Sequence, residues 1–334
     1  MPRPAQVRYG IRASGCGSSW HGGGWSVGVA ALLLGLLISA TNLDPDSSMR
    51  WQYGLLVLAL AALHYVATAI AARAAAGISL PIGETLLVQL AAAAANRLTP
   101  AGIGAAAVSV RYFTRRGLRL TAAMGAVAAL SVLGAVADLI LLSTLVLAGR
   151  WFGLSGGSQE INVLATHVEH LVAPVRSPWL WSAAAAVATG LALIWIWSGC
   201  AGLTHRGGQF WTPAARMLRH PLSLAILLLA SGATTLILGF AFIASTAMIP
   251  GPSPHTSLGA LLVGFMVGAA AGSAVPVPAG VGSTEAALVA VLIQVQVPAS
   301  HALAEVLVFR ILTFWLPAAL GMLALRRLRR RRAL

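Results

Sequence analysis

One stretch inside an apolar region of the sequence cannot continue as a membrane helix. Residues 275–285 (VPVPAGVGSTE) contain two prolines, two glycines and a carboxylate. A helix ends there, because proline has no backbone N–H to donate and glycine loosens the backbone. Non-helical backbone is tolerated at membrane depth only where protein buries it or where it lines a wet cavity. The stretch therefore predicts the break of a re-entrant hairpin at a polar site.

The chain contains a second copy of this break. Residues 99–105 (TPAGIGA) match residues 277–283 (VPAGVGS), and apolar arms flank both. The predicted arms are 83–96 and 104–116 in the first copy, and 258–274 and 283–297 in the second. A chance match is the alternative, because Pro-Ala-Gly is common in a chain rich in Ala and Gly. Paired Gly/Pro-interrupted segments in two halves point to a transporter's binding site, so we interpret them as a repeat.

The composition is that of a membrane protein. Hydrophobic residues make up 58% of the chain and charged residues only 9%, which indicates several membrane spans and excludes a soluble domain. The net charge of +14 comes entirely from Arg, since the chain has no Lys. These arginines cluster at the ends of apolar segments, as orientation in a membrane requires, so we expect no nucleic-acid partner.

We expect an all-α integral membrane protein with about six full transmembrane helices plus two re-entrant broken-helix hairpins, related as an inverted repeat. The expected full spans are 25–41, 51–72, 120–148, 178–200, 222–248 and 300–325. The domain prediction is a flexible basic tail at 1–24, one polytopic domain at 25–325 and a basic cytoplasmic tail at 326–334. Repeat 1 covers about 83–148 and repeat 2 about 257–325. A cleaved signal peptide is the alternative for 25–41.

The arginines also predict the orientation. With this topology, seventeen arginines fall on one face and three on the other. The positive-inside rule makes the richer face cytoplasmic. We therefore expect a multi-pass protein of the cell inner (plasma) membrane with both termini in the cytoplasm. The three full spans between the hairpins would invert the second copy.

Ionisable residues inside a membrane are functional candidates by default, because burying a charge in hydrocarbon is costly. We expect Arg97 to pair with Glu285 or Asp138, and Arg310 with Glu285 or Glu305. Purely structural pairing is the alternative interpretation. The candidate substrate-binding residues are Asn96, Arg97, Pro100, Gly102, Gly104, Arg111, Asp138, Pro278, Gly280, Gly282, Ser283, Glu285, Glu305 and Arg310.

An anionic head group is the expected ligand of these residues. Arginine offers a planar fork that suits phosphate, and free N–H groups are expected where the second arms begin, at Gly104 and Ser283. We expect no cofactor and no metal. His167 and His170 with Glu169 could suggest a metal site, but two histidines three residues apart on a polar loop are a weak pattern. The aromatic residues Phe309, Phe314 and Trp315 are interpreted as lipid-facing or packing groups. His64 is interpreted as a packed or interfacial histidine, with a proton relay as the alternative.

Two motifs resemble a known family. Residues 96–104 (NRLTPAGIG), followed by Arg111 and Asp138, resemble the first signature of the lysylphosphatidylglycerol synthase transmembrane (flippase-domain) family. Residues 278–286 (PAGVGSTEA), followed by 310–317 (RILTFWLP), resemble its second. Two departures stand out: Ala105 replaces a frequent Glu, and Ala279 replaces a paired glycine.

The resemblance implies a membrane domain that moves a lipid between leaflets. Some members are fused to an aminoacyl-transferase domain, for which this chain has no room, so the resemblance implies a stand-alone member. We expect a flippase- or scramblase-like translocator of a phospholipid, aminoacyl-phospholipid or polyprenyl-phosphate-linked lipid, and no enzyme activity. A non-catalytic accessory protein for an envelope glycosyltransferase or lipid-modifying enzyme is the alternative. The expected partners are membrane lipids with anionic head groups, and both a homo-oligomer and a partner transferase stay open.

Overall fold

The computed structural model describes residues 49–97, 99, 103–151, 220–250, 257–274 and 282–330. Every regular element within these ranges is a helix. The elements are α2 (Trp51–Ala76), α3 (Ile82–Arg97), α4 (Ile103–Arg115), α5 (Leu120–Trp151), α9 (Pro221–Thr246), α10 (Leu258–Ala274), α11 (Ser283–Gln294), α12 (Ala299–Arg310), the π-helix η4 (Ile311–Trp315) and α13 (Leu316–Arg330).

Four helical stretches are long and apolar enough to cross a membrane: Trp51–Ala76, Leu120–Leu145, Pro221–Thr246 and Ala299–Leu328. They correspond to four of the six expected spans. The other two, 25–41 and 178–200, lie outside the described residues, so the count of six stays a prediction. Large apolar side chains on the outer faces remain exposed; Leu229 of α9, for example, is 74% exposed. Such faces suit a lipid environment.

The first predicted hairpin is formed by α3 and α4, which pack against each other. With 16 and 13 residues, they are about 24 and 20 Å long, short of the roughly 30 Å of hydrocarbon. The Thr99 hydroxyl joins the two arms, because it accepts from the Gly104 N–H at 2.7 Å and donates to the Ala95 carbonyl at 3.3 Å. A Cβ at Gly104 would lie 2.4 Å from that carbonyl oxygen, so only glycine fits there.

Polar contacts join the two arms at the end of the hairpin that lies away from its break. Glu84 at the start of α3 forms a salt bridge with Arg116, just after α4. This hydrogen bond raises the pKa of the Arg116 guanidinium above its usual value. Deeper between the arms, the Thr85 and Tyr112 hydroxyls are buried and 3.2 Å apart.

The second hairpin, α10 and α11, closes even more tightly. A Cβ on Gly272 of α10 would lie 2.4 Å from the Thr284 Cα of α11. The Ser283 hydroxyl donates to the Gly272 carbonyl at 2.8 Å across the same contact. Gly282, just before α11, has φ +88°, which L side chains rarely adopt. Small residues therefore allow both broken helices to return on themselves.

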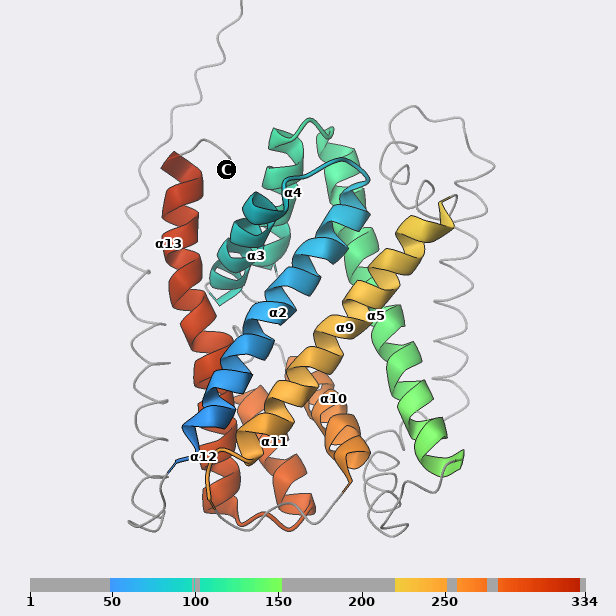
Figure 1. Cartoon of the computed structure of the whole chain (residues 1–334). Coiled ribbons are helices and arrows are strands. Elements are labelled where there is room, and N and C mark those ends of the chain that lie inside the picture. The colour runs from blue at the N-terminus through green and yellow to red at the C-terminus, as the bar shows by residue number, and fades with distance from the viewer. Residues whose placement is uncertain are drawn as a thin grey trace, which may run out of the picture.

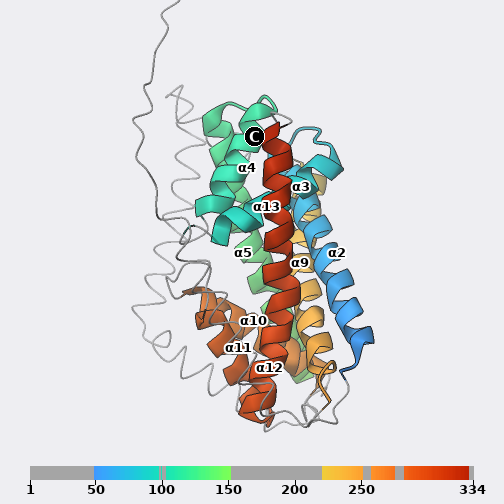
Figure 2. The ribbon, with the colours of Figure 1, turned by 90° about the vertical axis from the view of Figure 1, so that its left-hand side faces the viewer.

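The two hairpins lie at opposite ends of the molecule (Figure 1). The pair α3 and α4 lies at the end where α2 finishes and where α13 ends, and α10 and α11 lie at the other; the turned view agrees (Figure 2). Each hairpin has its own core. The core around the first hairpin contains the buried side chains of Tyr112 and Phe113. The core around the second contains those of Phe242, Phe265 and Phe309.

Long helices hold the two ends together. Helix α2 packs along α9, and α13 packs along α3, which Figure 2 shows side by side. The α13–α3 contact is close, because a Cβ on Gly321 would lie 2.1 Å from the Leu90 carbonyl oxygen. Because α12, η4 and α13 follow one another without a gap, this continuous helical stretch joins the second hairpin's core to the first hairpin. It also continues to Arg330, into the segment predicted as a tail.

Candidate functional site

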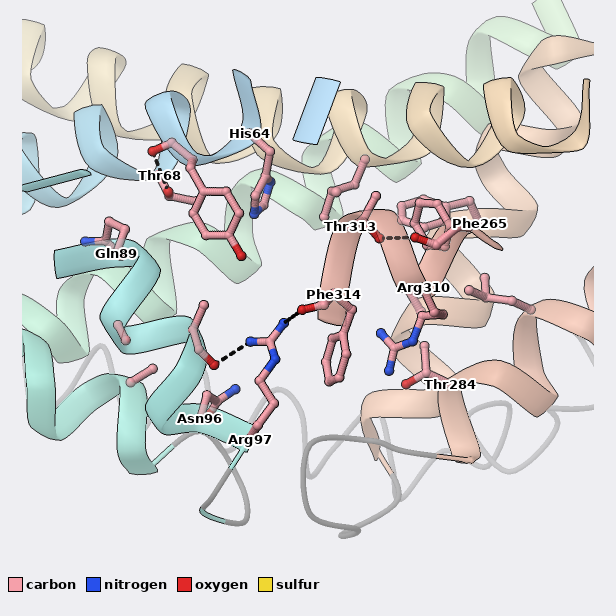
Figure 3. Close-up of a pocket in the computed structure, with 18 residues that line it drawn as sticks. His64, Thr68, Gln89, Asn96, Arg97, Phe265, Thr284, Arg310, Thr313 and Phe314 are labelled. Carbon is pink, nitrogen blue, oxygen red and sulfur yellow. Dashed lines mark hydrogen bonds between the residues drawn. The ribbon is translucent and has the colours of Figure 1, made fainter. Parts of the chain in front are cut away.

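A pocket of about 340 Å³ lies between the two hairpin cores. Residues of α2, α3, α4, α9, α10, α11, α12 and η4 line it. The α3 wall includes Ala92, Ala93, Asn96 and Arg97, and the opposite wall includes Phe309, Arg310, Thr313 and Phe314 (Figure 3). Its volume is in the range of sites that bind small molecules. The arms of the two predicted hairpins therefore meet around one cavity.

Two arginines occupy the two faces of a single aromatic ring in this pocket. The Arg97 Cζ lies 3.8 Å from the centroid of the Phe314 ring and the Arg310 Cζ lies 3.9 Å from it. Figure 3 shows Phe314 between the two guanidiniums. Each contact is an attractive cation–π interaction. Because Arg97 ends α3 and Arg310 ends α12, the ring joins a charge from each half of the chain.

Among the described residues, Arg310 is paired with a carboxylate and Arg97 is not. The Arg310 Nε donates to Glu285 Oε1 at 2.6 Å, and the side chains are only 10% and 14% exposed. The other Glu285 oxygen accepts from the Gly282 N–H at 2.7 Å, in the first turn of α11 where a carboxylate is favourable. Arg97 has no salt bridge within the described ranges; its Nη2 donates to the Phe314 carbonyl at 3.1 Å and its Nη1 donates to the Ala93 carbonyl.

The site therefore has one positive charge in excess and donors to spare. The Arg97 Nε and the Arg310 Nη2 are buried with no hydrogen-bond partner in the described part of the chain. Leaving a charged N–H group buried and unpaired is costly. A singly charged anion that entered the pocket would balance the excess positive charge and could accept hydrogen bonds from the unpaired N–H groups.

Comparison with known proteins assigns the chain to a family. A family model described as the lysylphosphatidylglycerol synthase TM region matches residues 24–321. The chain belongs to this family. The resemblance inferred from residues 96–104 and 278–286 is confirmed, and the chain is a multi-pass membrane protein of the lysylphosphatidylglycerol synthase transmembrane family. No curated protein matches it.

The structure brings some predicted site residues of this family member together and separates others. Asn96, Arg97 and Arg310 line the pocket, and Glu285 is paired to Arg310 at its side. The expected pairing of Arg97 with an acid is not formed. Pro100, Gly102, Pro278 and Gly280 lie outside the described residues.

Three other charged candidates lie away from the pocket lining. Asp138 of α5 accepts from the Thr235 hydroxyl of α9 at 2.6 Å, so it ties two long helices together. Glu305 on α12 is 2% exposed, and its Oε2 has no hydrogen-bond partner among the residues described. Arg111 is exposed on α4.

The expected free backbone donor at the first break is wrong. The Gly104 N–H is taken by the Thr99 hydroxyl. In the second break the Gly282 N–H is taken by Glu285, and the Ser283 hydroxyl bonds to Gly272. The breaks thus satisfy these groups internally, and the arginine side chains supply the spare donors of this pocket.

Sequence reasoning missed two important groups of this lysylphosphatidylglycerol synthase family member. Phe314, interpreted as packing or lipid-facing, is the shared ring between the arginines. Its spacing of four from Arg310 was the available signal, because such residues share a helix face. His64 of α2 also lines the pocket, and no motif pointed to it.

Proposed function

We propose that this protein moves a phosphodiester lipid from one leaflet of the membrane to the other. The observation that supports the proposal is the pair of buried, under-satisfied guanidiniums with one excess positive charge between the two hairpins. A phosphodiester has one negative charge and acceptor oxygens that match the arginine fork. The family membership supports a lipid-related role.

The stacking on Phe314 is compatible with phosphate binding. A guanidinium uses its flat face for a ring and its edge for hydrogen bonds. Both arginines have one face on Phe314, so the ring fixes their planes while edge donors remain available. Holding the donors in place before the ligand arrives lowers the cost of ordering them on binding.

In this proposal the hairpins form an inverted repeat, and each contributes to one central site. Transporters of that design expose the site alternately to the two sides by moving one repeat against the other. Six full spans, cytoplasmic termini and location in the cell inner membrane belong to the same proposal. The basic residues at the ends of α2, α4 and α13 support this orientation, since these three ends lie at one end of the molecule.

A vesicle assay tests the proposal. The purified protein is reconstituted into liposomes with a fluorescent phosphatidylglycerol, and a membrane-impermeant quencher reports the rate at which label leaves the inner leaflet. We expect wild type to exceed empty vesicles, and Arg97→Gln to be slower by about 10- to 100-fold, as the loss of a charge-assisted hydrogen bond implies.

The matched control is Arg115→Gln, which removes an exposed arginine at the far end of α4. It should leave the rate unchanged. Wild-type rates equal to those of empty vesicles would refute translocation and favour the accessory role. Equal rates for Arg97→Gln and wild type would refute this pocket as the site.

A further inference from the structure

Several uncharged polar residues of the pocket offer hydrogen-bond acceptors, and Tyr65, Gln89 and Thr284 also line it. The His64 Nδ1 lies 3.2 Å from the Thr234 carbonyl, and a carbonyl only accepts, so Nδ1 holds the proton. In the neutral ring, Nε2 is then left as an acceptor. The Thr68 and Thr313 hydroxyls donate to the carbonyls of Tyr65 and Phe309, which leaves their oxygen lone pairs.

Asn96 adds a further acceptor beside Arg97. It lines the pocket, and its Oδ1 is buried without a hydrogen-bond partner in the described part of the chain. Together with His64, Thr68 and Thr313 it forms what we term the acceptor wall. A ligand that satisfied this wall would need hydrogen-bond donors as well as a phosphate.

The described lining of the pocket offers no acid to balance a cationic donor. None of the described residues that line the pocket is Asp or Glu. Among the described acids, Glu84 pairs with Arg116, Asp138 with Thr235 and Glu285 with Arg310. Glu305 is buried on α12 outside the lining. The residues of the two breaks that are not described contain no acid either.

We propose that this pocket selects a phosphodiester whose head group is an uncharged polyol, such as glycerol or a sugar, over head groups with an ammonium or aminoacyl group. The inference rests on the proposed function and narrows its substrate class. Hydroxyls donate to the acceptor wall and accept from the spare guanidinium N–H groups. An ammonium donates too, but it cannot accept. Because the phosphate already balances the excess charge of the two arginines, the ammonium would be a buried cation with no acid in the described lining to balance it.

The expected size of this preference follows from the cost of burying a charge. An ion that is buried without a partner costs several kcal/mol. Sites built to bond a ligand hydroxyl also reject analogues that lack it strongly. We therefore expect a preference of at least about tenfold for the polyol lipids.

A lipid panel measures this preference in the vesicle assay with wild-type protein. The probes are labelled phosphatidylglycerol, a polyprenyl phosphate monosaccharide, phosphatidylethanolamine and lysylphosphatidylglycerol. Faster movement of either polyol lipid supports the inference, and the faster of the two identifies the lipid source. Equal rates across the panel, or faster movement of an amine lipid, would overturn the inference while leaving translocation intact.

A binding measurement shows whether head-group selectivity or lipid translocation has failed. Thermal stabilisation of the detergent-solubilised protein is compared for glycerophosphoglycerol and glycerophosphoethanolamine. If no lipid moves but the polyol stabilises more, translocation fails and head-group selectivity holds. If neither compound stabilises and no lipid moves, both proposals fail.

The substitution Asn96→Asp tests the charge argument within one protein. It keeps the side-chain shape and adds a carboxylate to the acceptor wall. The ratio of polyol to amine transport should fall by at least about tenfold. The control Gln52→Glu adds the same charge at an exposed position of α2 and should leave the ratio unchanged. An unaltered ratio in Asn96→Asp would contradict the inference.

Discussion

Replacing Glu285 by Gln should weaken the fold through one lost hydrogen bond. Glu285 accepts from two donors, with one oxygen facing the Arg310 Nε at 2.6 Å and the other facing the Gly282 N–H at 2.7 Å. Glutamine has the same shape but only one acceptor oxygen. Either the arginine or the backbone N–H would therefore face an amide NH₂ group.

The size of the effect follows from burial. Because the Arg310 and Glu285 side chains are only 10% and 14% exposed, solvent screens the pair weakly. Losing one hydrogen bond to a charged group costs about 1.5–3 kcal/mol. At about 2 °C per kcal/mol for a large domain, the Tm should fall by about 3–6 °C.

A double-mutant cycle is the appropriate assay. Thermal unfolding is recorded in one detergent for wild type, Glu285→Gln, Arg310→Gln and the double variant. If the two side chains interact, the double variant loses less stability than the two single losses added together, by about 1 kcal/mol or more. Strictly additive losses would refute the pairing and the geometry on which the charge count of the pocket depends.

Two further predictions concern the breaks. Gly272→Ala should prevent closure of the second hairpin, because the new Cβ would lie 2.4 Å from the Thr284 Cα. We expect the free energy of unfolding to fall by about 1–3 kcal/mol in thermal unfolding, as for an overpacked core. The control Gly232→Ala, where a Cβ meets open space, should be neutral or stabilising. Thr99→Val should cost about 1 kcal/mol, the worth of an N-terminal cap, because the Gly104 N–H loses its acceptor. Unfolding midpoints equal to wild type in Gly272→Ala or Thr99→Val would show that these contacts are absent from the folded protein.

The helices were predictable from the sequence to within a few residues. Predicted arms at 83–96 and 258–274 correspond to Ile82–Arg97 and Leu258–Ala274. This accuracy has a simple cause: proline and glycine end helices by local backbone chemistry, which does not depend on the rest of the fold. The second arm of the second hairpin, expected to reach 297, ends at Gln294.

The contacts of the site were harder to predict. The pairing of Arg310 with Glu285 was one of two options given for each residue, and the choice depends on how α11 and α12 pack. Arg97 uses carbonyls and the Phe314 ring in place of an acid. No local pattern states that a guanidinium at the end of α3 will meet a ring in the last span. That proximity comes from the packing of α13 against α3.

The shared ring of Phe314 makes the pocket depend on both halves of the chain. Without the second hairpin and the helices that follow it, the Arg97 guanidinium would lack the ring that it contacts. Without the first hairpin, one face of that ring would have no arginine against it. Neither hairpin would enclose the cavity alone, because residues of both line it.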